Sequence, residues 1–255
     1  MILDAFRLDG RVALVTGAAR GLGQGIALGL AEAGADVAVL DRIATDETET
    51  AITALGRRTI GLTADLVGLT QDEATSVIAR VTTGLGRVDI LVNNAGILHR
   101  DPAIDYPASA WDATLAINLT AAFYLSQAAA KAFLAAGNGG KIVNMASMLS
   151  FQGGALVPAY TAAKSGIAGI THALANEWAT HGINVNAIAP GYMATEITAA
   201  LRADPSRGPS MLGRIPAGRW GDPEDLQGAV VFLSSDAAAY IHGVVLPIDG
   251  GWLSW

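Results

Sequence analysis

Short runs of β-branched and other apolar residues alternate with alanine-rich helical stretches along the whole chain, and this alternation most constrains the fold. The predicted strands span residues 12–15, 36–40, 59–62, 88–92, 141–145, 183–188 and 244–248. Strands separated by helices pair in parallel through right-handed crossovers. The pattern predicts an α/β, doubly wound fold with a seven-stranded parallel sheet and helices on both faces. Ligands in such folds bind beyond the carboxyl ends of the strands.

The length and apolar content fit one domain outside a membrane. A chain of 255 residues can bury one sizeable core, so we expect a single domain over residues 1–255. Hydrophobic residues make up 51% of the chain but fall in short runs, well below the ~18 to 20 uninterrupted apolar residues of a membrane span. The segment 1–7 lacks the basic and apolar regions of a secretory signal. We therefore expect a cytoplasmic protein without a membrane partner.

The charge and the residue types disfavour several classes of protein. A formal net charge of −7 and a pI near 5.0 oppose binding to a phosphate backbone, so nucleic acid is not an expected partner. The chain has no cysteine, which excludes disulfides, thiolate catalysis and cysteine-bound zinc. Its four histidines lack a short metal-ligand spacing, so no metal is expected.

One segment interrupts the alternation of strands and helices. Residues 203–220 are rich in proline and glycine and are predicted to form a loop. Long insertions of this kind often cover an active site. We expect a substrate lid at about residues 192–220.

A glycine-rich turn follows the first predicted strand. Gly17, Gly21 and Gly23 have the spacing G-x-x-x-G-x-G and precede a helical stretch. Glycines let the backbone turn tightly and approach a phosphate, and the N-terminus of the next helix attracts the anion. The spacing differs from the common G-x-G-x-x-G pattern, and a purely structural turn would also explain it. Its position after the first strand favours a Rossmann-like dinucleotide site.

Charged residues near this turn bear on the choice of nucleotide. Asp41 ends the second predicted strand, where a carboxylate can bind ribose hydroxyls and repel a 2′-phosphate. Arg20 and Arg42 act in the opposite direction, since a guanidinium can pair with that phosphate, but both are equally well explained as solvated surface charges. We give the carboxylate more weight, and NAD is the expected cofactor, with NADP less favoured.

Two further strand ends carry candidate cofactor contacts. Asp65 follows the third predicted strand and could bind the adenine amino group. The turn 93–96, Asn-Asn-Ala-Gly, follows the fourth and could bring backbone close to the cofactor. Local turn chemistry explains both sites as well as ligand binding does.

Tyr160 and Lys164 are candidates for proton transfer. They lie four residues apart on a predicted helix and share its inward face with Ile167 and Thr171. A free phenol has a pKa of about 10, and an ammonium ~5 Å away lowers it by roughly two units at an effective dielectric constant of ~20. We expect Lys164, helped by an oxidised nicotinamide ring, to bring Tyr160 near neutrality. A buried tyrosine and a surface lysine would be the simpler explanation of the pair alone.

Two more polar residues fit this site. Ser147 ends the fifth predicted strand, thirteen positions before Tyr160, where its hydroxyl can hold a substrate oxygen or simply form a turn. Asn118 interrupts the apolar face of a predicted helix. A buried amide needs partners, so Asn118 is either a satisfied core residue or the holder of a water that links Lys164 to solvent.

These ordered motifs resemble those of the short-chain dehydrogenase/reductase family, over essentially the whole chain. They are Thr16 to Gly23, residues 93–96, Asn118, Ser147, Tyr160-x-x-x-Lys164, and Pro190-Gly191 with Thr195. The resemblance implies a catalytic tetrad of Asn118, Ser147, Tyr160 and Lys164, with Lys164 also binding the nicotinamide ribose and residues 190–195 placing the nicotinamide. The expected cofactor contacts are Gly17, Arg20, Gly21, Leu22, Gly23, Asp41, Arg42, Asp65, Leu66, Asn93, Ala95, Gly96, Tyr160, Lys164, Pro190, Gly191, Met193 and Thr195.

Within the family, several segments resemble bacterial dehydrogenases of deoxy-keto sugar acids. These segments are 21–25, 126–133, 137–154, 188–195 and 214–221. The resemblance is weakest at residues 42–50 and after Pro247. It implies that a hydride moves between a substrate carbinol and NAD while Tyr160 exchanges the proton on oxygen.

A carboxylate substrate needs a cationic anchor. Arg100 follows the fourth predicted strand, and Arg214 and Arg219 lie in the expected lid. Arg219 is equally well placed to pair with the nearby acidic residues of 222–225. The candidate substrate contacts are Arg100, Ser147, Met148, Phe151, Gln152, Tyr192 and Arg214.

The family resemblance also implies a homotetramer. Small residues in 121–136 and 159–178 permit close packing of helices between subunits, or equally against the chain's own sheet. Two other functions compete with sugar-acid oxidation and reduction. One is action on another polyol or a 3-oxoacyl thioester, which Asp41 and the negative charge disfavour. The other is a catalytically silent nucleotide-binding regulatory protein, which the complete tetrad disfavours.

Overall fold

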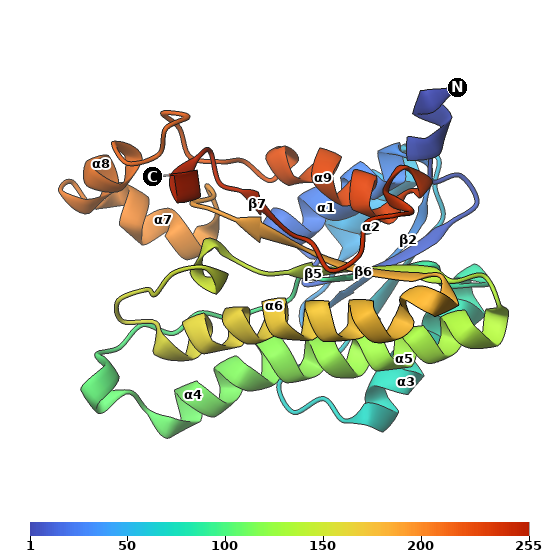
Figure 1. Cartoon of the computed structure of the whole chain (residues 1–255), viewed down its shortest axis with the longest axis horizontal. Coiled ribbons are helices and arrows are strands. Elements are labelled where there is room, and N and C mark those ends of the chain that lie inside the picture. The colour runs from blue at the N-terminus through green and yellow to red at the C-terminus, as the bar shows by residue number, and fades with distance from the viewer. Residues whose placement is uncertain (255) are drawn as a thin grey trace.

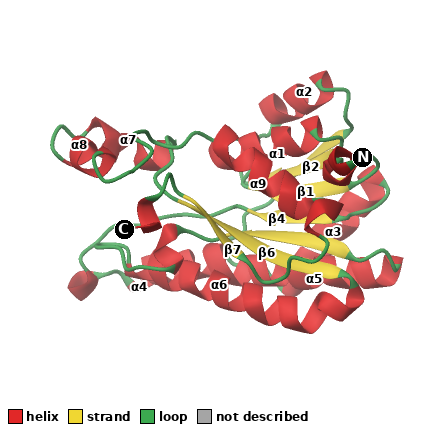
Figure 2. Cartoon of the chain, turned by 45° about the horizontal axis from the view of Figure 1, so that its top comes forward, coloured by secondary structure: helices red, strands yellow, loops and turns green. Residues whose placement is uncertain are grey.

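The apolar runs form seven parallel strands in the order β3-β2-β1-β4-β5-β6-β7. The structure is a computed structural model that describes residues 1–254, apart from the side chain of Ile197. Figure 2 shows the sheet enclosed by helices. The strands are β1 (Val12–Thr16), β2 (Asp36–Asp41), β3 (Thr59–Thr63), β4 (Ile90–Asn93), β5 (Gly140–Met145), β6 (Ile183–Pro190) and β7 (Val245–Ile248). The predicted doubly wound α/β fold is confirmed.

Helices cover both faces of this sheet. In Figure 1, α1, α2 and α9 lie above it, and α3, α4, α5 and α6 lie below it. The helices are α1 (Gly21–Glu32), α2 (Asp46–Ala54), α3 (Gln71–Leu85), α4 (Ala108–Leu115), α5 (Ala121–Ala136), α6 (Pro158–Trp178), α7 (Glu196–Ala203), α8 (Arg207–Leu212) and α9 (Glu224–Ser234). No helix within the described residues is long and apolar enough to cross a membrane.

Two hydrophobic cores follow from the alternation of side chains along each strand. Leu14 of β1 packs into the core with Phe133 of α5 and residues of α3 and α6. Its neighbour Val15 points to the other face and packs with Ile26 of α1 and Val230 of α9. Because both faces are covered, the strands read as nearly continuous apolar runs.

The strand order reverses beside β1, which places the carboxyl ends of β1 and β4 next to each other. Such a switch point leaves a crevice in which ligands bind. The glycine-rich turn that follows β1 and the polar turn that follows β4 both lie there. The fold therefore brings the predicted cofactor residues to one edge of the sheet.

The expected lid is an excursion between β6 and α9 that extends beyond this edge (Figure 1). Its base is closed by hydrogen bonds from Ala194 N to the Gly221 carbonyl at 2.6 Å and from Gly221 N to the Tyr192 carbonyl at 3.0 Å. The prediction of a continuous loop over 203–220 was wrong, because α8 lies within it. Pro209 is in the first turn of α8, where the N–H that proline lacks has no helical acceptor.

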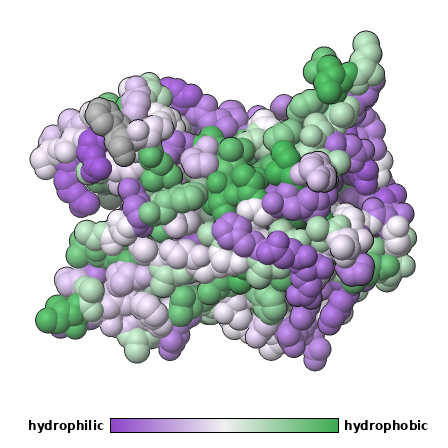
Figure 3. Space-filling model, viewed as in Figure 1, coloured by the Kyte–Doolittle hydropathy of each residue, from purple (hydrophilic) through white to green (hydrophobic). Residues whose placement is uncertain are grey.

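Apolar side chains also reach the surface. Figure 3 shows them near the middle of the face that β7 crosses and at the projecting N-terminus. Met1, Ile2 and Leu3 are exposed at that terminus, and Val245 and Leu246 of the edge strand β7 are half-buried.

Candidate active site

The turn after β1 is built for glycine at three positions. Gly17 and Gly21 have φ values of +65° and +61°, and a Cβ on Gly23 would overlap the Gly17 carbonyl oxygen. Asn94 braces the same turn, donating from Nδ2 to the carbonyls of Thr16 at 2.8 Å and Gly17 at 3.1 Å. Sequence reasoning placed Asn94 in the motif but missed this role, which requires the spatial contact between β1 and β4.

The turn is open toward the crevice. A Cβ on Gly21 would meet nothing within 4 Å, and the N-terminal N–H groups of α1 follow directly. An open, backbone-lined helix N-terminus fits the phosphates of a dinucleotide.

Asp41 lies beside this turn at the end of β2. Its carboxylate accepts hydrogen bonds from Ala19 N at 3.0 Å and Arg42 N at 2.7 Å, so its position is fixed by backbone. Arg20 pairs with Glu196 of α7 at 2.5 Å, with both side chains largely exposed. The guanidinium of Arg20 therefore contacts the lid through a surface ion pair.

Three of the predicted cofactor residues have side chains committed elsewhere. Asn93 is buried and donates from Nδ2 to Ser126 Oγ and Asn144 Oδ1, both at 2.9 Å. Leu66 belongs to the hydrophobic core. The carboxylate of Asp65 accepts from Val67 N at 2.9 Å in its own turn. These side-chain contacts are structural.

The remaining predicted cofactor residues lie along the same edge. Ala95 N donates to Thr16 Oγ1 at 3.0 Å, which joins the turn after β4 to β1. Pro190 ends β6, and Met193 is buried at the base of the lid. Thr195 precedes α7 as its N-cap. Leu22, Gly96 and Gly191 are their partly buried or exposed neighbours.

Tyr160 and Lys164 share the inward face of α6, as the sequence predicts. Ile167 and Thr171 continue that face and are fully buried. The Lys164 ammonium lies 5.4 Å from the centroid of the Tyr160 ring and donates to the Met145 carbonyl at the end of β5, at 2.6 Å. The end of β5 and the start of α6 thus form one side of the site.

Ser147 follows β5 and faces Tyr160. Its Oγ caps the next turn by accepting from Leu149 N at 3.1 Å. Ser150 in that turn donates to the Lys164 carbonyl at 2.6 Å. This turn therefore fixes the distance between the Ser147 hydroxyl and α6.

Burial controls the protonation of this pair. It raises the pKa of Tyr160 to about 12, although a hydrogen bond with Ser147 and the charge of Arg100 lower it. Burial also lowers the pKa of Lys164 to about 7. The expectation that Lys164 and an oxidised nicotinamide ring together bring the pKa of Tyr160 near neutrality concerns the cofactor-bound enzyme and stays a prediction. In the chain without cofactor, desolvation is the largest cause of both pKa shifts.

Asn118 lies in a π-helical turn, Ala116–Thr120, between α4 and α5. Its Nδ2 donates to the carbonyls of Ile97 at 2.9 Å and Thr114 at 3.0 Å. Its Oδ1 is buried and has no partner among the described residues. π-turns are frequent at functional sites, and an unsatisfied amide oxygen is suited to hold a water.

An aromatic cluster forms a second wall of the site and packs against the same apolar residues as Tyr160. The ring of Tyr192 packs edge-on against Trp252 at 4.8 Å and Trp220 at 5.5 Å. Arg214 also stacks on Trp252, with its Cζ 4.2 Å from the ring centroid. The C-terminal segment thus supplies a wall residue, Trp252, that sequence reasoning missed because no local motif marks it.

Three arginines surround this wall. Burial raises the pKa of the Tyr192 phenol, and the positive charges of Arg214, Arg207 and Arg100 act to lower it. Arg207, on α8, was absent from the sequence-based candidates, since no local motif marks its proximity to Tyr192.

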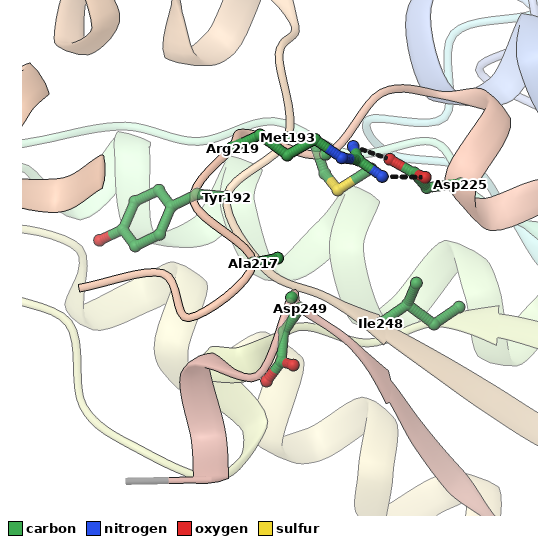
Figure 4. Close-up of a pocket in the computed structure, with 9 residues that line it drawn as sticks. Tyr192, Met193, Ala217, Arg219, Asp225, Ile248 and Asp249 are labelled. Atoms are coloured by element: carbon green, nitrogen blue, oxygen red, sulfur yellow. Dashed lines mark hydrogen bonds and ion pairs between the residues drawn. The ribbon is translucent and has the colours of Figure 1, made fainter. Parts of the chain in front are cut away.

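Arg219 is engaged in an ion pair beside a small pocket of about 160 Å³ near Tyr192. Figure 4 shows it facing Asp225, with contacts of 2.6 and 2.7 Å. Of the two roles considered for Arg219, the structure shows the ion pair with a nearby acidic residue. Asp225 accordingly has its pKa lowered to about 2, chiefly by this bond.

The residues after Ser147 separate into two groups. Met148 is buried with Leu149 and Trp252 in one apolar cluster. Phe151 is 52% exposed, and Gln152 is half-buried. Met148 therefore belongs to the wall, whereas Phe151 lies at its rim.

Replacing Gly23 tests the turn. We expect Gly23→Ala to weaken NADH binding by at least about tenfold, because the Cβ displaces the Gly17 carbonyl. Gly228→Ala on α9, where a Cβ meets nothing within 4 Å, should keep wild-type affinity and gain about 0.5 to 1 kcal/mol of stability. Fluorescence titration and thermal melting measure both effects. Wild-type affinity in Gly23→Ala would contradict this role.

Replacing Lys164 tests its buried charge. A pKa near 7 against 10.5 in the unfolded chain means that the unfolded state binds more protons between these values, so stability rises with pH in this window. Lys164→Met removes this dependence. Its stability advantage over wild type should shrink by about 2 to 3 kcal/mol between pH 7 and pH 9. Exposed Lys131, changed to Met, should follow wild type at each pH in denaturant melts. A constant difference for Lys164→Met would refute a depressed pKa.

Comparisons with known proteins agree with this geometry. A family described as "Enoyl-(Acyl carrier protein) reductase" matches residues 17–253. The 2-dehydro-3-deoxy-D-gluconate 5-dehydrogenase of Escherichia coli is 55% identical, with 100% of both chains covered. The Bacillus subtilis enzyme of the same name is 49% identical over 98% of both chains.

A solved structure extends the comparison to three dimensions. A candidate 2-deoxy-D-gluconate 3-dehydrogenase from Agrobacterium tumefaciens with bound NADP has a TM-score of 0.93 and 53% identity, covering 99% of this chain and 100% of its own. The fold, the ordered motifs and these full-length similarities place the chain in the short-chain dehydrogenase/reductase family of NAD(P)-dependent oxidoreductases.

Proposed function

We propose that this enzyme interconverts a secondary alcohol and a ketone on a deoxy-keto sugar acid, with NAD as the preferred cofactor. The observation that carries the substrate class is the set of arginines near Tyr160 and Tyr192. The charge of Arg100 lowers the pKa of both phenols, so Arg100 lies near both the reacting end and the aromatic cluster. A substrate carboxylate beyond the carbinol could pair with a guanidinium there. The names of the similar proteins support the same class.

The side chains divide the chemistry among them. When bound, the nicotinamide supplies or accepts the hydride, and its oxidised ring is positively charged. Ser147 orients the substrate oxygen with its hydroxyl, and Tyr160 exchanges the proton on that oxygen. In the chain alone the phenol is protonated at neutral pH, so it is ready to donate to a ketone. During reduction, Lys164 and the water that we assign to Asn118 Oδ1 then pass a proton from solvent to Tyr160. During oxidation they carry the proton in the opposite direction.

The preference for NAD follows from the groups around the adenosine end. Asp41 is fixed at the end of β2, where it can bind ribose hydroxyls. Arg20 pairs with Glu196 on the surface, which competes only weakly with a 2′-phosphate. NADP is bound by the similar Agrobacterium protein, which makes the preference a property to be measured in this chain.

We also propose that the enzyme is a homotetramer. The edge strand β7 presents half-buried Val245 and Leu246 on a surface where Figure 3 shows apolar side chains. An edge strand with apolar neighbours is suited to contact a second copy.

Tyr160→Phe tests the proton-transfer role. Without the hydroxyl, the substrate oxygen loses its proton partner, so we expect kcat to fall by at least about 100-fold. NADH affinity should change less than about twofold, since the ring and its packing are retained. Steady-state absorbance assays and fluorescence titration separate the two readouts. Substantial turnover in this variant would overturn the assignment of Tyr160.

A panel of sugar acids and neutral polyols, assayed with NADH or NADPH for reduction and with the oxidised forms for oxidation, tests the substrate and cofactor classes. We expect at least about tenfold higher kcat/KM for a 2-dehydro-3-deoxy sugar acid than for its neutral analogue. Arg100→Gln should reduce this ratio, whereas Arg80→Gln, an exposed arginine on α3, should not.

The substrate class and the cofactor preference are contradicted by different results. Turnover of neutral polyols alone would refute the carboxylate anchor. A higher kcat/KM with the phosphorylated cofactor would refute the preference for NAD and leave the substrate class standing.

A further inference from the structure

Leu156 has an unusual backbone conformation beside the active site. It is the single non-glycine residue with a positive φ, +66°, between residues 1 and 254. Side chains other than glycine rarely adopt this region, and such strain persists only where surrounding contacts enforce it. The leucine side chain is 43% exposed, so side-chain burial alone does not offset the strain. A contact made by the backbone of Leu156 stabilises this conformation instead.

The carbonyl of Leu156 makes that contact. It accepts a hydrogen bond from Asp101 N at 2.9 Å. Leu156 lies two residues before α6, the helix that carries Tyr160, and Asp101 directly follows Arg100. The bond therefore joins the segment of the catalytic tyrosine to the segment of the proposed carboxylate anchor.

The residues that flank Arg100 are held by two further hydrogen bonds to the backbone. Asn118 Nδ2 donates to the Ile97 carbonyl at 2.9 Å, and Tyr106 Oη donates to the His99 carbonyl at 3.3 Å. His99 also contacts Asp101 through side chains at 3.1 Å. Arg100 is exposed between these fixed points. Its backbone is constrained on both sides, and the Leu156 bond constrains the side nearest Tyr160.

We propose that Leu156 is a positioning residue whose left-handed backbone sets Arg100 at the distance from Tyr160 that a sugar-acid carboxylate requires. This inference rests on the proposed function of Arg100. Leu156 touches neither substrate nor cofactor in this role. It acts through the hydrogen bond to Asp101.

Two substitutions separate the backbone from the side chain. Valine is apolar like leucine but β-branched, which disfavours a positive φ, whereas asparagine tolerates it. We expect Leu156→Val to raise KM for the sugar acid by about five- to tenfold. Its kcat should change less than about twofold, and NADH affinity and KM for a neutral polyol should stay at wild-type values. Leu156→Asn should retain wild-type KM for the acid.

A double-variant cycle tests the route through Arg100. If Leu156 acts through Arg100, then Leu156→Val should add little to the KM of Arg100→Gln. Independent, multiplying effects would overturn the proposal. Equal effects of valine and asparagine would also overturn it, since they would indicate side-chain packing. A loss of kcat on all substrates, paralleled by a lower melting temperature, would indicate a merely structural role and refute it as well.

Failure of the proposed function gives a different result. In that case the wild-type enzyme itself shows no preference for the acid over the polyol. If wild type has the preference and Leu156→Val keeps it in full, the function stands and the role of Leu156 is refuted.

Discussion

Lys164 places a nearly fully buried amine at the end of β5, with the Met145 carbonyl as its acceptor. Burial makes its charge costly, which is why its pKa falls toward 7. The arrangement is possible only because β5 ends where α6 begins its inward face, so that an unpaired strand carbonyl meets a helix side chain. This one contact depends on the sheet order, on the turn at Ser147 and on the register of α6. A lysine that can lose its proton near neutral pH is also a lysine that can pass one on.

Much of the fold was predictable from sequence, because strands whose two faces are both buried consist mainly of apolar residues. Strands such as β1 and β4 are buried at every position, so they appear as short, mostly apolar runs between helical stretches. The catalytic pair was predictable because the spacing of Tyr160 and Lys164 alone puts them on one helix face. Asn118 was only partly predictable. Its type was noticed, but the π-turn that turns Oδ1 away from a partner depends on packing of α4 and α5 that no local pattern encodes.

Features that depend on segments far apart in sequence were not predictable. Arg214 stacks on Trp252, and Tyr192 packs against the same ring, so the second wall of the site combines the lid with the end of the chain. Arg207 joins them because α8 forms inside a proline- and glycine-rich segment. The pKa values of Tyr160 and Lys164 in the chain alone were not predictable for a related reason: Coulomb attraction can be estimated from spacing, whereas desolvation requires the packed structure.

Two carboxylates, Asp41 and Glu196, bear on the choice between NAD and NADP. Asp41 acts on a 2′-phosphate by direct repulsion, whereas Glu196 acts through its ion pair with Arg20. Asp41 repels a 2′-phosphate, but the N–H groups of Ala19 and Arg42 that bind it offset part of its negative potential. They also prevent it from rotating away, so a 2′-phosphate would have to break these bonds or accept the repulsion. Glu196 acts instead by pairing with Arg20 on the surface, and exposed pairs contribute only about 0 to 1 kcal/mol. A phosphate could therefore compete for Arg20 at little cost. The fixed carboxylate, and not the surface pair, must account for most of any preference for NAD.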